Sequence, residues 1–238
     1  MWLTEKVAII TGVSKDGQVG QTVAQSFARG GARLAITARS ARDLEARAQE
    51  VRELGAEVLV LPADLTDEQA VRDLVRLTLE HYGRIDVLVN LAGGLTIHTP
   101  LAQTTLDMWT RELNNNLLSA FLCSREVFGQ MQTQGGGSII FFTRAGQPRE
   151  KMVAYNCAKA GVEALVRTLA YEGRTLNIRA NAIGPGIVET RSNIESMKPE
   201  DTARWAQREE IAAAVVFLAS DAASGITGQV LAVPGRTL

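Results

Sequence analysis

The stretch VAIITGVSKDGQVG, residues 7–20, decides the fold. It opens with a short apolar run rich in β-branched residues, which is typical of a strand buried on both faces of a sheet. A glycine-rich turn follows, then a helical pattern that ends at Gly30-Gly31, then a second apolar run at 34–37. Strand, glycine-rich turn, helix and strand form the unit that binds dinucleotides, because glycines let the backbone approach a pyrophosphate and a helix N-terminus offers N–H groups. The alternative interpretation is a plain turn, in which the glycines serve the backbone geometry and do not indicate a dinucleotide site.

Apolar runs and helical patterns alternate along the rest of the chain. Further strands are predicted at 57–61, 85–89, 138–142, 178–183 and 229–233, and helices at 43–54, 67–81, 106–134, from Tyr155 onward, and at 209–220. This alternation predicts a three-layer α/β fold with a doubly wound parallel sheet, the Rossmann fold. No linker-like stretch divides the chain, so residues 1–238 are predicted to form a single domain.

The composition limits the classes of function. Of the 238 residues 46% are hydrophobic, which is enough for a sizeable core, and the net charge of −1 gives no support for a nucleic-acid or membrane surface. The two cysteines fall in no metal-ligand spacing, and two histidines offer little for a metal site. No leader or membrane-spanning run is recognised, so we expect a cytoplasmic protein without a metal.

The end of the second predicted strand discriminates between nicotinamide cofactors. An acidic residue there would hold a ribose 2′-hydroxyl, but this chain has Ala38 followed by Arg39. A guanidinium can bind a 2′-phosphate through two hydrogen bonds, and Lys15 in the glycine-rich turn could reach the same phosphate. Both residues favour NADP(H) over NAD(H), and two solvated surface cations are the alternative.

Tyr155 and Lys159 stand four residues apart at the start of a predicted helix. Positions i and i+4 share one helix face, about 6 Å apart along the axis. An ammonium there favours the tyrosinate, so we expect the pKa of Tyr155 to fall from about 10 towards a range useful for proton transfer. For the pair alone, the alternative is an ordinary amphipathic helix with a partly buried tyrosine and a surface lysine.

Taken together, these motifs resemble the short-chain dehydrogenase/reductase superfamily from about residue 6 to residue 235, and within it the 3-oxoacyl-carrier-protein reductases. In chain order the motifs are Thr11-Gly12…Gly20, Asp64-Leu65, Asn90-x-Ala92-Gly93, Asn116-Leu117, Tyr155-x-x-x-Lys159, Asn181-Ala182-x-x-Pro185-Gly186 and Thr227-Gly228-Gln229. The resemblance implies an oxidoreductase that interconverts a carbonyl and an alcohol of a small molecule by hydride transfer. It also implies a homodimer or homotetramer, with the long central helices at the subunit contacts.

The resemblance implies a role for each matching residue. Tyr155 would be the general acid in reduction and the base in oxidation, and Lys159 would lower its pKa and bind the nicotinamide ribose. Asn116 would hold a water behind Lys159, and Thr143 stands where the family has a serine that donates to the substrate oxygen. Cofactor contacts are expected from Gly12, Ser14, Lys15, Gly17, Val19, Gly20, Arg39, Asp64, Leu65, Asn90, Ala92, Gly93, Tyr155, Lys159, Pro185, Gly186, Val188 and Thr190.

The glycine-rich turn departs from the family pattern. The interval from Gly12 to Gly20 is two residues longer than the common turn, with Gln18 in place of the middle glycine, and this length resembles the enoyl-reductase branch. That branch places its tyrosine seven residues before the lysine, where this chain has Met152. Carbonyl reduction therefore stays the prediction, with an enoyl reductase and a non-catalytic NADP(H)-binding sensor or partner subunit as alternatives.

The serine motif is a second departure, because it reads Thr143-Arg144-Ala145-Gly146 and lies one residue closer to Tyr155 than usual. Thr143 keeps a hydroxyl that can donate, but a slip of one residue would put Arg144 at that position. Losing such a donor would lower the rate about 10²–10³-fold. The substrate pocket is expected from residues 94–99, 144–152 and 187–208, where Arg144 and Arg149 would suit an acidic substrate.

Overall fold

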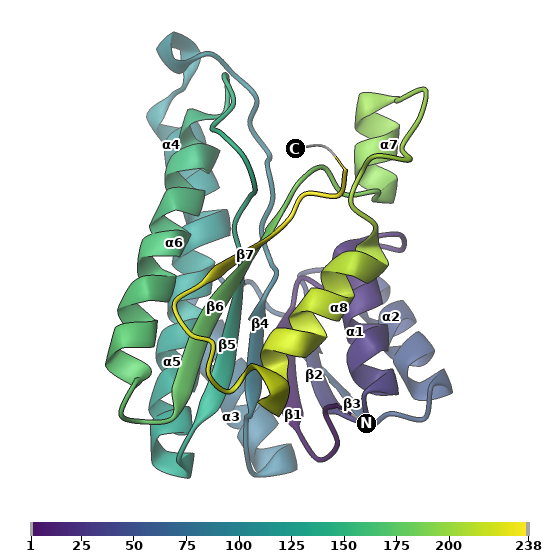
Figure 1. The fold of residues 1–238 in the computed structure, drawn as a ribbon, viewed down its shortest axis with the longest axis vertical. Helices are drawn as coiled ribbons and strands as arrows, with labels where there is room; N and C mark the ends of the chain where they lie inside the picture. The colour runs from purple at the N-terminus through teal and green to yellow at the C-terminus, as the bar shows by residue number, and fades with distance from the viewer. Residues whose placement is uncertain (1, 237–238) are drawn as a thin grey trace.

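Seven parallel strands form one sheet with helices on both faces in the computed structural model, which describes residues 2–236 (Figure 1). The predicted domain, 1–238, also includes Met1, Thr237 and Leu238, which lie outside the described residues. The strands are β1 Val7–Thr11, β2 Arg33–Thr37, β3 Val58–Val60, β4 Val87–Asn90, β5 Gly137–Phe142, β6 Ile178–Pro185 and β7 Val230–Val233. Their order, β3-β2-β1-β4-β5-β6-β7, confirms the predicted doubly wound sheet.

Helices cover the two faces of this sheet in two groups (Figure 1). One face carries α1 Val19–Arg29, α2 Ala41–Glu53 and α8 Arg208–Ala219. The other carries α3 Glu68–Tyr82, α4 Leu106–Leu113, α5 Ser119–Gln134 and α6 Val153–Gly173. The short α7, Arg191–Met197, lies beyond the sheet near the start of α8, and 3₁₀ turns occupy Leu101–Gln103 and Asp221–Ala223 (Figure 1).

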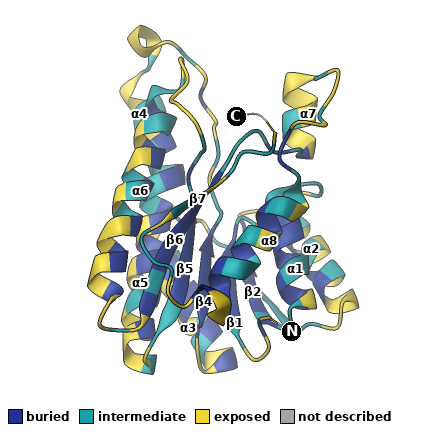
Figure 2. Cartoon of the chain, viewed as in Figure 1, coloured by how far each residue is buried: buried dark blue, intermediate teal, exposed yellow. Residues whose placement is uncertain are grey.

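The central strands are buried on both faces, as their unbroken apolar runs predict (Figure 2). Successive residues of a strand point to opposite faces. Ile10 therefore packs in the core under α1, α2 and α8, whereas its neighbour Ile9 packs in the core under α3, α5 and α6. Two separate apolar cores hold the sheet between the helix layers, so the edge where its loops emerge is a rigid platform.

The helix predicted at 106–134 is interrupted by a π turn at Asn114–Leu118, which separates α4 from α5. The side-chain amide of Asn116 donates to the carbonyl of Glu112 at 3.0 Å and so competes with the backbone ladder. Single π turns of this kind are frequent at functional sites. Apolar spacing alone contains no signal for such an interruption, which is why the sequence predicted one continuous helix.

None of the helices in residues 2–236 is long and apolar enough to cross a membrane.

Candidate active site

The loops at the carboxyl ends of the strands are joined into a ring by backbone contacts. The loop after β4 meets the loop after β5 where Thr99 N–H donates to the carbonyl of Lys151 at 2.7 Å. The loop after β5 meets the end of β6 where Ala145 N–H donates to the carbonyl of Pro185 at 2.8 Å. The segment after β6 returns to the loop after β1, since Arg191 N–H donates to the carbonyl of Gly17 at 3.0 Å. The three predicted pocket segments therefore lie at one edge of the sheet.

The glycine-rich turn after β1 has the tight backbone that a dinucleotide site needs. Gly12 has a φ of +74°, and a Cβ there would lie 2.9 Å from the backbone of Ala92. A Cβ at Gly20 would lie 2.5 Å from the carbonyl oxygen of Gly12. Helix α1 starts at Val19 without a side-chain cap from Gln18, so its first N–H groups keep their affinity for an anion. These features fit a pyrophosphate at the start of α1.

The extended part of this turn binds to α7. Asp16 forms an ion pair with Arg191, and Gln18 accepts a hydrogen bond from the hydroxyl of Ser192 at 2.9 Å. A side-chain hydrogen bond from Gln21 has the largest effect on the pKa of Asp16 and lowers it. Burial opposes this effect, and the charges of Arg191 and Arg47 lower the pKa further. The lengthened turn therefore reaches across to the segment after β6.

The remaining predicted cofactor residues follow the same edge. Arg39 is exposed directly after β2, and its charge helps two hydrogen bonds from Thr66 to lower the pKa of Asp64. Asn90 is turned inward, because its amide donates to the hydroxyl of Ser124 at 2.9 Å. Of the others, Leu65, Val188 and Thr190 are buried, Ser14, Ala92, Pro185 and Gly186 are half-buried, and Lys15 and Gly93 are exposed.

Lys159 is a buried lysine, only 6% exposed, and Tyr155 lies one turn before it on α6. Its Nζ donates to the carbonyl of Phe142, at the end of β5, at 2.9 Å. The same Nζ lies 5.5 Å from the centroid of the Tyr155 ring. The alternative of a surface lysine on an ordinary amphipathic helix is therefore wrong, and the two side chains form a close pair.

Burial dominates the protonation of this pair. It lowers the pKa of Lys159 to about 8, against an opposing effect of the Glu112 carboxylate. It raises the pKa of Tyr155, and the charge of Arg144 lowers that pKa while Glu112 raises it. The expected fall in the pKa of Tyr155 is therefore wrong. The pKa is raised instead, because burial disfavours the phenolate.

Asn116 fastens the loop after β4 to the helical layer. Its Oδ1 accepts from Gly94 N–H at 2.9 Å, and its Nδ2 donates to the carbonyl of Gly94 at 3.1 Å. With the further bond to the carbonyl of Glu112, both N–H groups of the amide donate to backbone carbonyls. That Asn116 holds a water behind Lys159 stays a prediction.

Thr143 lies beside the pair but makes its hydrogen bonds to α6. Its hydroxyl donates to Glu163 at 3.0 Å and approaches the carbonyl of Lys159 at 3.4 Å. The next residue, Arg144, donates to the carbonyl of Gln147, while its charge reaches Tyr155. The structure thus brings both alternatives for the donor to the site and leaves the choice between them open.

Glu112 is the residue that sequence reasoning missed. It has no exposed surface, and its carboxylate accepts from Thr96 N–H at 3.0 Å in the loop after β4. A signal was present, because Glu112 lies four residues before Asn116 and three after Trp109, on the inward side of its helix. Within residues 2–236, no group of three or more His, Cys, Asp or Glu side chains could hold a metal ion.

Comparisons with known proteins agree with this geometry. Residues 12–235 match the family described as Enoyl-(Acyl carrier protein) reductase. The short chain dehydrogenase/reductase astE of Aspergillus oryzae is 35% identical, covering 97% of this chain and 94% of its own length. A 3-oxoacyl-[acyl-carrier-protein] reductase of Synechocystis is 34% identical, covering 98% of this chain and 97% of its own length.

Solved structures support the same assignment. A 7α-hydroxysteroid dehydrogenase complexed with NADH and 7-oxo glycochenodeoxycholic acid superposes with a TM-score of 0.89 at 33% identity, covering 98% of this chain and 94% of that chain. The glycine-rich turn, the close Tyr155–Lys159 pair and these relatives lead to one conclusion. The chain belongs to the short-chain dehydrogenase/reductase superfamily, a family of oxidoreductases that use a nicotinamide cofactor.

Proposed function

We propose that the protein is an NADP(H)-dependent oxidoreductase that interconverts a carbonyl and an alcohol, with Tyr155 as the general acid and base. The observation that carries this proposal is the ammonium of Lys159, buried 5.5 Å from the Tyr155 ring at the edge where the glycine-rich turn fits a dinucleotide. Keeping a buried lysine charged is energetically unfavourable, so we expect Lys159 to have a functional role. Promoting proton transfer at Tyr155 is such a role.

The proposed roles follow from where each side chain lies. The glycine-rich turn and the loops after β4 and β6 would hold a nicotinamide cofactor, which would supply or accept the hydride. Tyr155 donates its phenolic proton to the substrate oxygen in reduction and takes it back in oxidation. Lys159 keeps a positive charge beside Tyr155, and Asn116 holds the loop after β4 against the helices.

The cofactor proposal rests on Arg39. It is exposed immediately after β2, next to Asp64, with no acidic residue at the end of the strand that could hold a ribose 2′-hydroxyl. An exposed guanidinium there supports a 2′-phosphate, and the exposed Lys15 supports it from the turn.

The donor proposal concerns Thr143. We propose that its hydroxyl exchanges Glu163 for the substrate oxygen during turnover. The exchange is feasible because the Glu163 side chain is 31% exposed and has a second partner in Arg167 at 3.3 Å. Arg144 is the competing donor, since its charge acts on Tyr155.

An enoyl reductase is the second candidate. The lengthened glycine turn and the description of the matching family favour it. Met152, in the place of that branch's tyrosine, opposes it, because a thioether cannot transfer a proton. A non-catalytic sensor is the third candidate, and the buried Lys159 beside Tyr155 opposes it.

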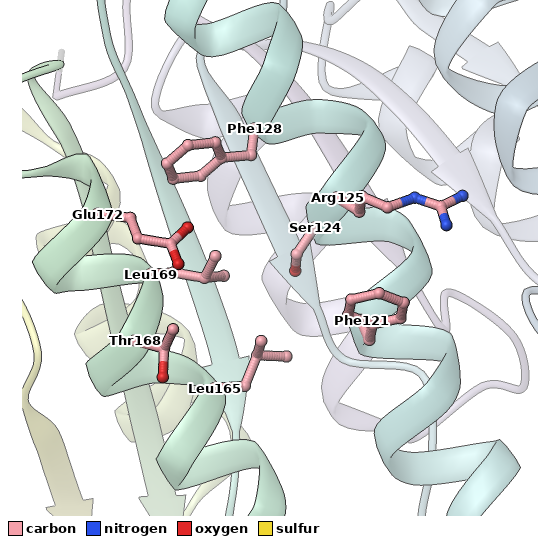
Figure 3. A pocket seen from close by; sticks show the side chains of 8 residues that line it. All are labelled: Phe121, Ser124, Arg125, Phe128, Leu165, Thr168, Leu169 and Glu172. Atoms are coloured by element: carbon pink, nitrogen blue, oxygen red, sulfur yellow. The ribbon is translucent and has the colours of Figure 1, made fainter.

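We also propose that the protein is a homodimer or homotetramer that pairs through α5 and α6. An apolar groove between these helices supports this, lined by Phe121, Ser124, Arg125, Phe128, Leu165, Thr168, Leu169 and Glu172 (Figure 3). Phe121 is 41% exposed at its rim. The free thiols of Cys123 and Cys157 support a reducing, cytoplasmic location.

Replacing the phenol tests the proposed reaction. The Tyr155→Phe variant should lose turnover about 10²–10⁴-fold, because the acid–base group is removed while the ring stays. NADPH absorbance would be followed with ketones, 3-oxoacyl thioesters, quinones, sugars and conjugated alkenes, and NADPH affinity measured in parallel should fall far less than turnover. Turnover of alkenes alone would identify an enoyl reductase, and NADPH binding without any turnover would identify a sensor.

Replacing Arg39 tests the cofactor. Arg39→Ala should weaken NADPH binding about tenfold or more and leave NADH binding nearly unchanged, because only NADPH carries the 2′-phosphate. Fluorescence titration with both cofactors measures the two affinities. Arg29→Ala is the matched control and should alter neither affinity, because Arg29 lies at the end of α1 away from the glycine-rich turn. Equal losses for the two cofactors in Arg39→Ala would contradict the phosphate assignment.

Replacing Thr143 tests the donor. Thr143→Ser should retain kcat, whereas Thr143→Val, which keeps the shape and removes the hydroxyl, should lower it about 10²-fold. Arg144→Gln is the comparison variant and should have the smaller effect. A large loss in Arg144→Gln, with Thr143→Val equal to the parent, would move the donor to Arg144.

A further inference from the structure

We propose that Glu112 is a positioning residue that acts through Lys159 and Tyr155. Its buried carboxylate provides the negative charge that offsets the Lys159 ammonium, and it also fixes the loop at 94–99 that borders the substrate. The consequence for turnover rests on the proposed function. The consequence for proton binding does not, because it needs no substrate.

The first observation is an unusual pair of buried charges. In residues 2–236, the buried carboxylate and ammonium groups are those of Asp86, Glu112 and Lys159. Asp86 has an ion-pair partner in Arg84 at 2.6 Å. In the same part of the chain, Glu112 and Lys159 form no ion pair within 4 Å of any group, although each is buried in the same region. Helix α4 packs against α6, so the two opposite charges act on one another across this contact, and the Glu112 carboxylate raises the pKa of Lys159.

The second observation is how the carboxylate is held. One oxygen of Glu112 accepts from Thr96 N–H at 3.0 Å, and the other accepts a short hydrogen bond from the Thr96 hydroxyl. The Glu112 carbonyl accepts from Asn116, which itself binds Gly94. The contacts Glu112–Thr96 and Asn116–Gly94 thus connect α4 and the π turn after it to the loop after β4. The carboxylate is therefore fixed in place, since each of its oxygens has a hydrogen-bond partner on Thr96.

The third observation is the direction of its electrostatic effect. Glu112 raises the pKa of both Lys159 and Tyr155. Arg144, from the loop after β5, acts on Tyr155 in the opposite direction. The other charged groups nearby have closer partners or face solvent: Glu163 on α6 binds Thr143 and Arg167, and Asp107, Arg111 and His98 are exposed.

Removing the Glu112 carboxylate should change the pKa of its neighbours in one direction only. Losing a negative charge lowers the pKa of every neighbouring acid, whichever of the coupled groups releases its proton first. In reduction Tyr155 must carry its proton, so the rate falls as pH rises through the pKa of the pair. A neutral residue at position 112 should therefore move this alkaline limb to lower pH.

Glu112→Gln tests the proposal, because glutamine keeps the shape and an acceptor for Thr96 N–H but not the charge. The alkaline limb of kcat/KM should move down by about one pH unit. Ultraviolet titration of Tyr155, taken as the difference between each protein and its Tyr155→Phe counterpart, should move in the same direction. Glu112→Asp keeps the charge and should restore the parent limb. Thr96→Val keeps the charge but loosens the loop, so it should raise KM without moving the limb.

The outcomes separate the two proposals. An unchanged Tyr155 titration in Glu112→Gln would overturn the role of Glu112, whatever the activity. A shifted titration without turnover of any substrate would support Glu112 and reject the proposed reaction. If Glu112→Gln does not fold, the double variant with Lys159→Met should fold, because it removes both buried charges. Failure of that rescue would also overturn the proposal.

Discussion

The buried ammonium of Lys159 is the constraint on which the rest of the site depends. A charged amine in a protein interior needs donors, acceptors and counter-charges around it. Here β5 provides the carbonyl of Phe142, α6 provides the Tyr155 ring, and α4 provides the carboxylate of Glu112. The Lys159 side chain therefore contacts β5 and the ring one turn before it on α6, and it interacts with the Glu112 charge of α4 at longer range. The two apolar cores on either side of the sheet hold these elements in register, so the fold fixes the pair before any substrate arrives.

The fold was predictable because its signals are local. Strands buried on both faces read as β-branched apolar runs, and the alternation with helices implies parallel crossovers. The residues of the site were predictable only as far as the family motifs reach. The π turn, the burial of Glu112 and the bond from Thr143 to Glu163 depend on side chains that meet through the fold. The pKa of Tyr155 was misjudged for the same reason, because spacing reveals a neighbouring charge but not the burial that outweighs it.

The glycine-rich turn is longer than the family pattern, and in the structure its extended part binds α7. The turn carries Asp16, Gly17 and Gln18 to the start of α7, where all three bind residues 191–192. This contact joins the loop after β1 to the segment after β6. The tight backbone at Gly12 and Gly20 is kept, so the turn gains a link to α7 without losing the geometry that suits a pyrophosphate.

Keeping Lys159 buried should lower the stability of the protein, and the free energy of unfolding as a function of pH tests this most directly. The pKa of Lys159 is about 8 in the folded chain, against 10.5 for an ordinary lysine. Between these values the unfolded chain binds more protons, so unfolding becomes harder as pH rises, and below pH 8 the full penalty is present. Lys159→Met should therefore be more stable than the parent at pH 7, on the order of a few kcal/mol, and the advantage should shrink as the pH approaches 10.5. Parallel stability curves for the two proteins across this range would contradict the account.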